Sequence, residues 1–114
     1  MRNIFDLVPD AGNYARRAAR YVDGLDFHVF VADEMRRQAV YFCLLVVGEA
    51  CNQIVAHKRP LPSDIPWREI KAMRNFIVHT YWDIDDEIVY RVARSDVLVL
   101  ATQLDLLLKQ LAHP

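Results

Sequence analysis

The sequence predicts an all-α fold, an up-and-down bundle of four main helices with one extra short helix. Apolar residues recur at three- and four-residue steps along most of the chain, as they do on one face of an α-helix. The three glycines and five prolines fall mainly between these periodic segments, where they indicate loops. A chain of 114 residues can bury one hydrophobic core, so we expect a single domain over residues 1–114.

Composition bears on assembly and on partners. Hydrophobic residues make up 54% of the chain, which exceeds the usual fraction of about 45–50%. A small monomer has much surface for its volume, so this excess favours a homodimer that buries apolar surface between two copies. The net charge of −1 excludes the overall basic field of a general nucleic-acid binder. Any contact with RNA is therefore expected to be local.

Two helices are expected in the first half of the chain. The first covers residues 7–22, with Pro9 in its first turn and Gly24 just beyond its end. The second is a long helix over residues 27–57, with the option of a short turn around residues 29–33 at its start. Its centre is apolar nearly all round, which is typical of a core helix. Gly48 interrupts this centre and is best tolerated where another backbone approaches closely.

The second half begins with a proline-rich loop over residues 58–66. Ser63 or Asp64 is expected to cap the third helix, with Pro66 in its first turn. A cluster of acids follows that helix, and we interpret it as the favourable N-terminal charge of the next one. Ser95 and Asp96 offer a further cap signal, which divides the remainder into helices over residues 85–94 and 96–111.

The cysteines and the start of the chain indicate the compartment. Cys43 and Cys51 lie in one helical pattern and lack the spacing of a metal site, so we expect buried, reduced thiols and neither a metal nor another cofactor. We find no leader pattern at the start of the chain and no run that we expect to be long enough to span a bilayer. A cytoplasmic location is therefore expected.

The segment over residues 73–82 places polar side chains in apolar sequence. On a helical wheel Asn75 and His79 are only about 40° apart and share a face, whereas Arg74 is about 140° from His79. Tyr81 would lie along the apolar stripe if the helix stays regular that far. Three explanations reconcile Arg74 with His79: its side chain wraps around the helix, the last turn distorts, or two copies form one site across a twofold axis.

These residue types can support metal-independent cleavage of RNA. Histidine titrates near neutrality and serves as a general acid or base. Arginine binds phosphate oxygens and stabilises the charge that grows on them in the transition state. Asn75 can position a ribose or a water molecule. The same residues also occur in purely structural roles, so their spacing alone does not establish catalysis.

The run from Arg74 to Tyr81 resembles the signature of the HEPN superfamily, and Tyr81 marks similarity to its HepT-like branch. The segments around Gly48 and Glu49, over residues 64–70 and over residues 81–85 are also similar to HepT-like proteins. Ala72 stands where many relatives have glycine, and Thr80 is one of several residues found between the His and the Tyr. The resemblance covers nearly the whole chain.

The resemblance implies an α-helical homodimer whose paired motifs form an endoribonuclease cleft, acting as the toxin of a toxin-antitoxin pair. Its implied partner is an MntA-like minimal nucleotidyltransferase, which neutralises the toxin by AMPylation of Tyr81. Added phosphate near Arg74 would occupy its guanidinium and repel RNA. Arg74, Asn75 and His79 are then the catalytic candidates.

Two hypotheses remain open at this stage. The first is a metal-independent endoribonuclease toxin, with Glu49 pairing with Arg74 to hold its guanidinium in place. The second is a non-catalytic helical adaptor, or a nucleotide-binding subunit, that docks a nucleotidyltransferase. Alanine replacements of Arg74 and His79 distinguish them, because only the first hypothesis requires these side chains for toxicity.

Overall fold

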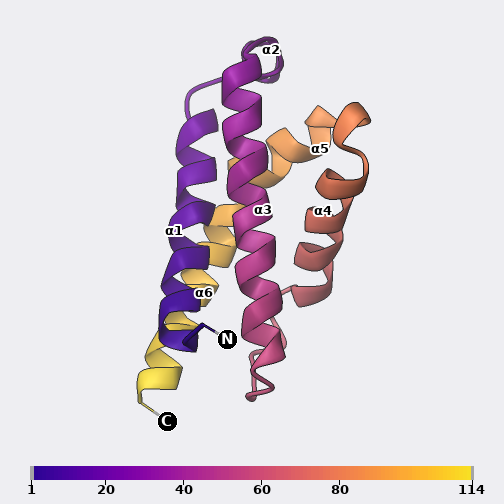
Figure 1. Cartoon of the computed structure of the whole chain (residues 1–114). Coiled ribbons are helices and arrows are strands. Elements are labelled where there is room, and N and C mark those ends of the chain that lie inside the picture. Colours follow the sequence, from indigo (N-terminus) through magenta and orange to yellow (C-terminus); the bar gives the residue numbers. More distant parts are fainter. Residues whose placement is uncertain (1, 114) are drawn as a thin grey trace.

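The protein is built from helices, as the sequence predicted. The structure, a computed structural model, describes residues 2–113, and all regular elements within that range are helical. The four long helices run alternately up and down, so both chain ends lie at the same end of the molecule (Figure 1). In chain order the elements are α1 (Ile4–Val22), α2 (Phe27–Ala32), α3 (Glu34–Ala56), α4 (Trp67–His79), η1 (Tyr81–Asp83), α5 (Asp86–Arg91), η2 (Val92–Asp96) and α6 (Val97–Ala112).

Helix α1 begins earlier than predicted. Asn3 is its N-cap, because the side-chain oxygen accepts a hydrogen bond from the backbone N–H of Phe5 at 2.8 Å. Pro9 therefore lies inside the helix and not in its first turn. The predicted end is confirmed: Gly24 follows the C-cap residue with a φ of 72°, a left-handed conformation that favours glycine.

The long helix predicted over residues 27–57 is divided into α2 and α3. Asp33 causes the break, since its backbone is extended and its side chain accepts a hydrogen bond from the N–H of Arg36 at 3.0 Å. Helix α3 has a window of mean hydropathy 1.7, so by length and composition alone it is long enough to cross a membrane, which corrects the sequence-based expectation. Here α3 packs between α1 and α4, and 44% of that window is buried inside the molecule.

Helix α4 starts after the predicted loop, but without the predicted cap. Neither Ser63 nor Asp64 caps it; Pro66 occupies the N-cap position and makes no side-chain hydrogen bond there. The carbonyl of Pro66 accepts the first helical bond, from Ile70 at 3.0 Å. The indole N–H of Trp67 donates to the carbonyl of Pro62 at 3.2 Å and ties the loop to the helix start.

The structure does change near Ser95 and Asp96, but the predicted helix cap does not cause that change. Asp96 is helical, with φ of −61° and ψ of −39°, and its side chain caps nothing. Instead the helix continues through η2, a π-helical turn in which the N–H of Val97 reaches the carbonyl of Val92, five residues back. α5, η2 and α6 therefore form one helix with a local change of hydrogen bonding.

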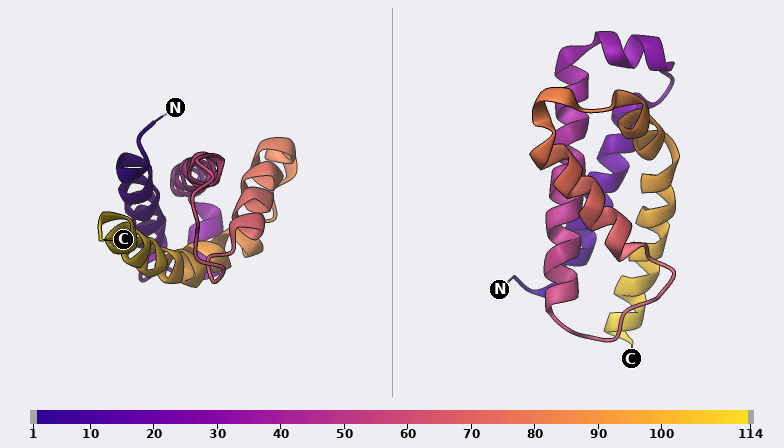
Figure 2. Two further views of the ribbon diagram at one scale, coloured as in Figure 1. Left: turned by 90° about the horizontal axis from the view of Figure 1, so that it is seen from below. Right: turned by 90° about the vertical axis from the view of Figure 1, so that its right-hand side faces the viewer.

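The core lies among α1, α3 and α6, and α4 is added at its side. α1 packs against both α3 and α6, whereas α4 packs mainly against α3. Figure 2 shows α4 crossing α3 diagonally, with α6 lying apart from it. Cys43 and Cys51 are free and buried in this core, which confirms the predicted reduced thiols, and burial raises the pKa of Cys51 to about 12.

Candidate functional site

Arg74 lies where α4 crosses α3 most closely. Opposite it is Gly48 of α3: a Cβ atom added to Gly48 would be 2.4 Å from the Cβ of Arg74 and 2.8 Å from its Cγ. Atoms this close to the backbone cannot swing away as the end of a flexible side chain can. The close approach predicted at Gly48 is therefore present, and it is the base of the Arg74 side chain that fills the space.

The guanidinium of Arg74 is held between two neighbours. Its Nη2 lies 3.6 Å from Oε2 of Glu49, the residue after Gly48, and its Nη1 donates to Oδ1 of Asn75 at 3.1 Å. The Arg74 side chain is 33% exposed and that of Glu49 is 53% exposed. An ion pair so open to water adds little stability, on the order of 0–1 kcal/mol. Its main effect is to direct the guanidinium toward α3.

His79 is the last residue of α4 and is exposed to solvent. The helix stays regular up to it, and both the N–H and the hydroxyl of Thr80 then donate to the carbonyl of Phe76, which ends the helix. A distorted last turn therefore does not bring Arg74 and His79 together. Since the guanidinium of Arg74 is directed toward α3, wrapping around α4 does not do so either.

Tyr81 and Trp82 stand beyond the helix end, in the short turn η1. Because α4 ends at His79, Tyr81 does not continue the apolar stripe and is 57% exposed. The two rings meet edge to face, with centroids 4.8 Å apart. Both border a cleft of about 300 Å³ that also includes residues of α3 and α5.

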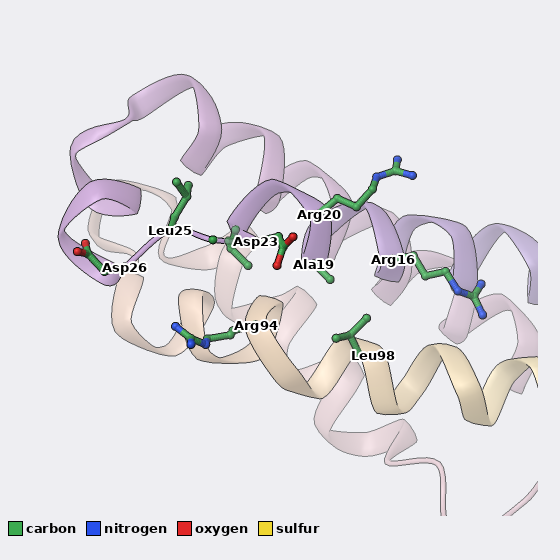
Figure 3. A pocket seen from close by; sticks show the side chains of 10 residues that line it. Arg16, Ala19, Arg20, Asp23, Leu25, Asp26, Arg94 and Leu98 are labelled. Atoms are coloured by element: carbon green, nitrogen blue, oxygen red, sulfur yellow. The ribbon is translucent and has the colours of Figure 1, made fainter.

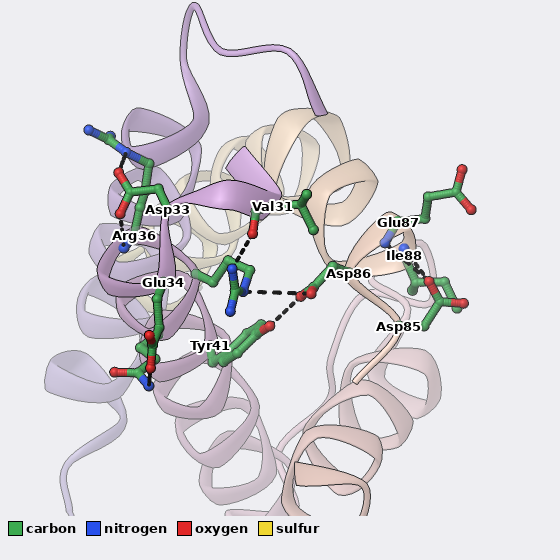
Figure 4. A network of polar contacts seen from close by, with 11 residues as sticks. Val31, Asp33, Glu34, Arg36, Tyr41, Asp85, Asp86, Glu87 and Ile88 are labelled. Atoms are coloured by element: carbon green, nitrogen blue, oxygen red, sulfur yellow. Dashed lines mark hydrogen bonds and ion pairs between the residues drawn. The ribbon is translucent and has the colours of Figure 1, made fainter. Parts of the chain in front are cut away.

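A polar network closes the back of this cleft. Asp86 of α5 accepts a hydrogen bond from the hydroxyl of Tyr41, and its Oδ2 lies 3.7 Å from Nε of Arg37 (Figure 4). Arg37 also donates to the carbonyl of Val31. Burial and the bond to Asp86 raise the pKa of Tyr41 to about 12. The network fastens the start of α5 to α3 and so fixes the far end of the segment that carries Tyr81.

The acidic cluster is arranged largely as predicted. Asp85 caps α5, with its Oδ1 accepting from the N–H of Glu87 at 3.1 Å and of Ile88 at 3.4 Å. Sequence reasoning missed the second role of Asp86, which is its contact with Tyr41 and Arg37. The partners of Asp86 are about 45 residues away in the sequence, and no local pattern signals such a contact.

A second cleft, of about 750 Å³, lies between α1 and the start of α6. It contains Arg16, Arg20 and Arg94, but Figure 3 shows their guanidinium groups pointing away from one another. Arg16 pairs with Asp105, and Arg94 donates to the hydroxyl of Tyr90 at 2.6 Å. These arginines therefore form no convergent anion site. Across residues 2–113 no group of three or more His, Cys, Asp and Glu is placed to hold a metal ion.

Comparison with known proteins covers most of the chain. Residues 11–107 match the sequence profile of a family described as Ribonuclease HepT-like. The chain is 27% identical over 94 residues to "Putative RNase MJ1380" of Methanocaldococcus jannaschii, a match that spans 82% of this chain and 83% of that protein. It is 26% identical over 96 residues to "Probable ribonuclease HepT" of Thermococcus cleftensis, spanning 84% and 87%. No solved structure gives a significant match.

Proposed function

Because the chain belongs to the HepT-like ribonuclease family, we propose that it is a metal-independent endoribonuclease with Arg74, Asn75 and His79 as catalytic residues. The observation that carries this proposal is the arrangement of Arg74. Its stem is packed on Gly48, and its guanidinium is held by Glu49 and Asn75 at the surface of the molecule. An arginine with a purely structural role would not need its guanidinium to be held in place beside an exposed face of α4.

The proposed reaction is an intramolecular attack within RNA. The 2′-oxygen forms a bond to the adjacent phosphorus, the bond from phosphorus to the 5′-oxygen breaks, and a 2′,3′-cyclic phosphate and a 5′-hydroxyl result. His79 takes the proton of the 2′-hydroxyl or gives one to the leaving 5′-oxygen. Arg74 stabilises the charge that develops on the phosphate oxygens, and Asn75 positions the ribose or the guanidinium.

A site shared by two copies of the chain agrees best with these positions. Arg74 and His79 are about 140° apart on a helix that is regular throughout, so one copy presents them on different sides. A twofold axis beside α4 would bring Arg74 of one copy near His79 of the other. Exposed apolar residues support a homodimer: Phe42 of α3 is 58% exposed, and Val78, one helical turn after Arg74 in α4, is 44% exposed.

We further propose that the protein is the toxin of a cytoplasmic toxin-antitoxin pair, neutralised by an MntA-like nucleotidyltransferase that transfers AMP from ATP to Tyr81. The phenol oxygen would form a bond to the α-phosphorus as the bond to the β-phosphate oxygen breaks; pyrophosphate leaves and the phenol proton is released. The exposure of Tyr81 supports this role. A phosphodiester two residues after His79 would repel an RNA backbone.

Cleavage by purified protein tests the nuclease proposal. Wild type, Arg74→Ala and His79→Ala are incubated with RNA in the presence of EDTA, and the same three are expressed in cells that lack a partner. We expect cleavage and toxicity from the wild type, and a loss of about 10²–10⁴-fold in both variants. An inactive wild type, or two folded variants that stay active, would instead favour the non-catalytic adaptor.

Mass spectrometry tests the role of Tyr81 separately. After co-expression with the nucleotidyltransferase we expect one or more AMP additions on Tyr81, with loss of nuclease activity. The control is Tyr81→Phe, which keeps the ring but cannot accept AMP, and which should stay active when the partner is present. A neutralised complex with unmodified Tyr81 would show that binding alone inhibits the enzyme.

A further inference from the structure

An unusually open aromatic pair lies next to the candidate catalytic residues. Trp82 is 92% exposed, the highest value among the large hydrophobic residues that the structure describes. Single exposed apolar side chains are common on proteins and need no explanation. Here, however, the 92% exposure leaves most of the indole open although it contacts the ring of Tyr81, and the pair borders a cleft. An aromatic platform beside a cleft is typical of sites that stack planar ligands.

The other walls of the cleft select the kind of ligand. Its lining includes the carboxylates of Glu34, Asp83 and Asp86 and the guanidinium of Arg37. Arg37 is already engaged by Asp86 and by the carbonyl of Val31, so it is not free to bind a phosphate. With Arg37 and Asp86 paired to each other, Glu34 and Asp83 leave an excess of negative charge, which disfavours a phosphate and favours a group that donates hydrogen bonds. A volume of about 300 Å³ is large enough for a nucleobase.

We propose that this cleft is a nucleobase subsite in which one base of the RNA substrate stacks on Trp82. The exocyclic amino group of that base donates to Asp83 or Glu34, in the way that carboxylates accept from the amino group of cytosine. Adenine, cytosine and guanine carry such a group and uracil does not, so the subsite discriminates against uracil. This inference rests on the proposed function, because it concerns the substrate of the same enzyme.

The position of the subsite agrees with that role. Trp82 follows His79 by three residues, and Thr80 and the 3₁₀ turn fix the path between them. The network of Asp86, Tyr41 and Arg37 fastens the opposite wall, so the cleft is formed before a ligand binds. A base held here would place its neighbouring phosphate toward the end of α4, where the proposed acid or base lies.

Binding is measured first, in full-length His79→Ala protein that also carries Trp67→Phe, so that Trp82 is the only fluorescent tryptophan. The probes are oligoadenylate, oligocytidylate and oligouridylate of equal length. We expect quenching of Trp82 emission at lower concentrations of the first two than of the third. Equal or absent quenching for all three would overturn the subsite.

Variants then identify the contact. Trp82→Ala should weaken binding of oligoadenylate and oligocytidylate by about 5- to 150-fold, as expected for the loss of one stacked base. This loss is followed by filter binding. Trp82→Phe should retain most of the affinity, whereas Trp82→Leu, which is apolar but not aromatic, should not. Asp83→Asn should reduce the preference over oligouridylate. The matched control is Leu106→Ala on α6, another exposed apolar side chain, which should leave binding unchanged.

The outcome can be separated from that of the nuclease proposal. If the wild type cleaves no RNA but Trp82 is quenched selectively, the subsite stands and the nuclease fails. If the wild type cleaves RNA and Trp82→Ala cleaves every sequence equally well, the nuclease stands and the subsite fails. Light scattering covers the remaining alternative: a Trp82→Ala protein that loses its dimer while keeping base affinity would assign Trp82 to a contact between copies and overturn the proposal.

Discussion

Helices α1 and α4 both pack against α3, but they are used very differently. Eight of the nineteen residues of α1 are fully buried, whereas Ile77 alone is fully buried among the thirteen described residues of α4. The apolar face of α1 is buried in the core. Helix α4 contacts the core along a narrow line, and most of its residues are partly or fully exposed to solvent. Stability and candidate chemistry are therefore carried by different helices, which makes them separable by mutation.

The sharpest test of this difference shortens one apolar side chain to alanine in each of the two helices. Leu7→Ala in α1 leaves a cavity at a fully buried position and should lower the free energy of unfolding by about 2–5 kcal/mol. Val78→Ala on the open side of α4 should cost at most about 1 kcal/mol. Chemical denaturation measures both. Equal losses would show that the outer face of α4 is as deeply buried in solution as the core.

A second test acts on the crossing of α3 and α4. Gly48→Ala places a methyl group against the Arg74 stem, so it should separate the helices, cost about 1–3 kcal/mol and lower RNA cleavage together with stability. Gly12→Ala in α1 is the matched control. Its added Cβ would meet only the end of the Arg16 side chain, at 3.3 Å, and Asp105 at 4.0 Å.

Because flexible ends can move, the control should gain about 0.5–1 kcal/mol from the better helix propensity of alanine. Thermal unfolding and cleavage assays are run on both proteins. Retained activity in a stable Gly48→Ala protein would show that Arg74 does not need its present position.

A smaller effect is expected at Glu49. Glu49→Gln removes the charge that directs Arg74 but keeps the size of the side chain, so cleavage should fall by about 10-fold while the free energy of unfolding changes by less than about 1 kcal/mol. Asp105→Asn, which breaks the exposed pair with Arg16 on the other side of the molecule, is the control and should leave cleavage unchanged. Similar activity in both variants would remove Glu49 from the site.

The smallest effect is a dependence on alkaline pH. The pKa of Tyr41 is raised from 10.0 to about 12, so the folded protein keeps this proton where the unfolded chain has lost it. The stabilisation is complete below about pH 10 and is lost as the pH rises toward about 12. Tyr41→Phe should show a shallower loss of stability across that range. An unchanged slope of stability against pH would contradict the burial of the Tyr41 phenol and its bond to Asp86.

Local signals in the sequence predicted the parts of the fold that depend on neighbouring residues. The four long helices, the left-handed Gly24 and the need for space at Gly48 all follow from periodicity or from the properties of glycine. The contact between Glu49 and Arg74 was expected and is present in the geometry. Its role in catalysis, like those of His79 and Tyr81, remains a proposal.

The parts that could not be predicted depend on partners far away in the sequence. The break at Asp33 was foreseen only as an optional turn over residues 29–33, whereas residues 27–32 are helical and Asp33 itself caps α3. Asp86 was read as one of several helix-start acids, although it also bonds to Tyr41. The π turn replaced a predicted cap at Asp96 because packing of both flanking helices, and not the cap residue, decides the hydrogen bonding there.

The π turn has a consequence for how the two ends of its helix are rotated relative to each other. A hydrogen bond to the fifth residue back accommodates one residue more than an α turn, which shifts the angular phase of α5 relative to α6 by about 100°. Deleting Ser95 would cancel that shift and turn Asp86 away from Tyr41. The position of Asp86, and with it the cleft wall opposite Trp82, thus depends on a π turn that lies outside the candidate site. Shortening this helix by one residue would rotate that wall without touching the residues proposed for catalysis.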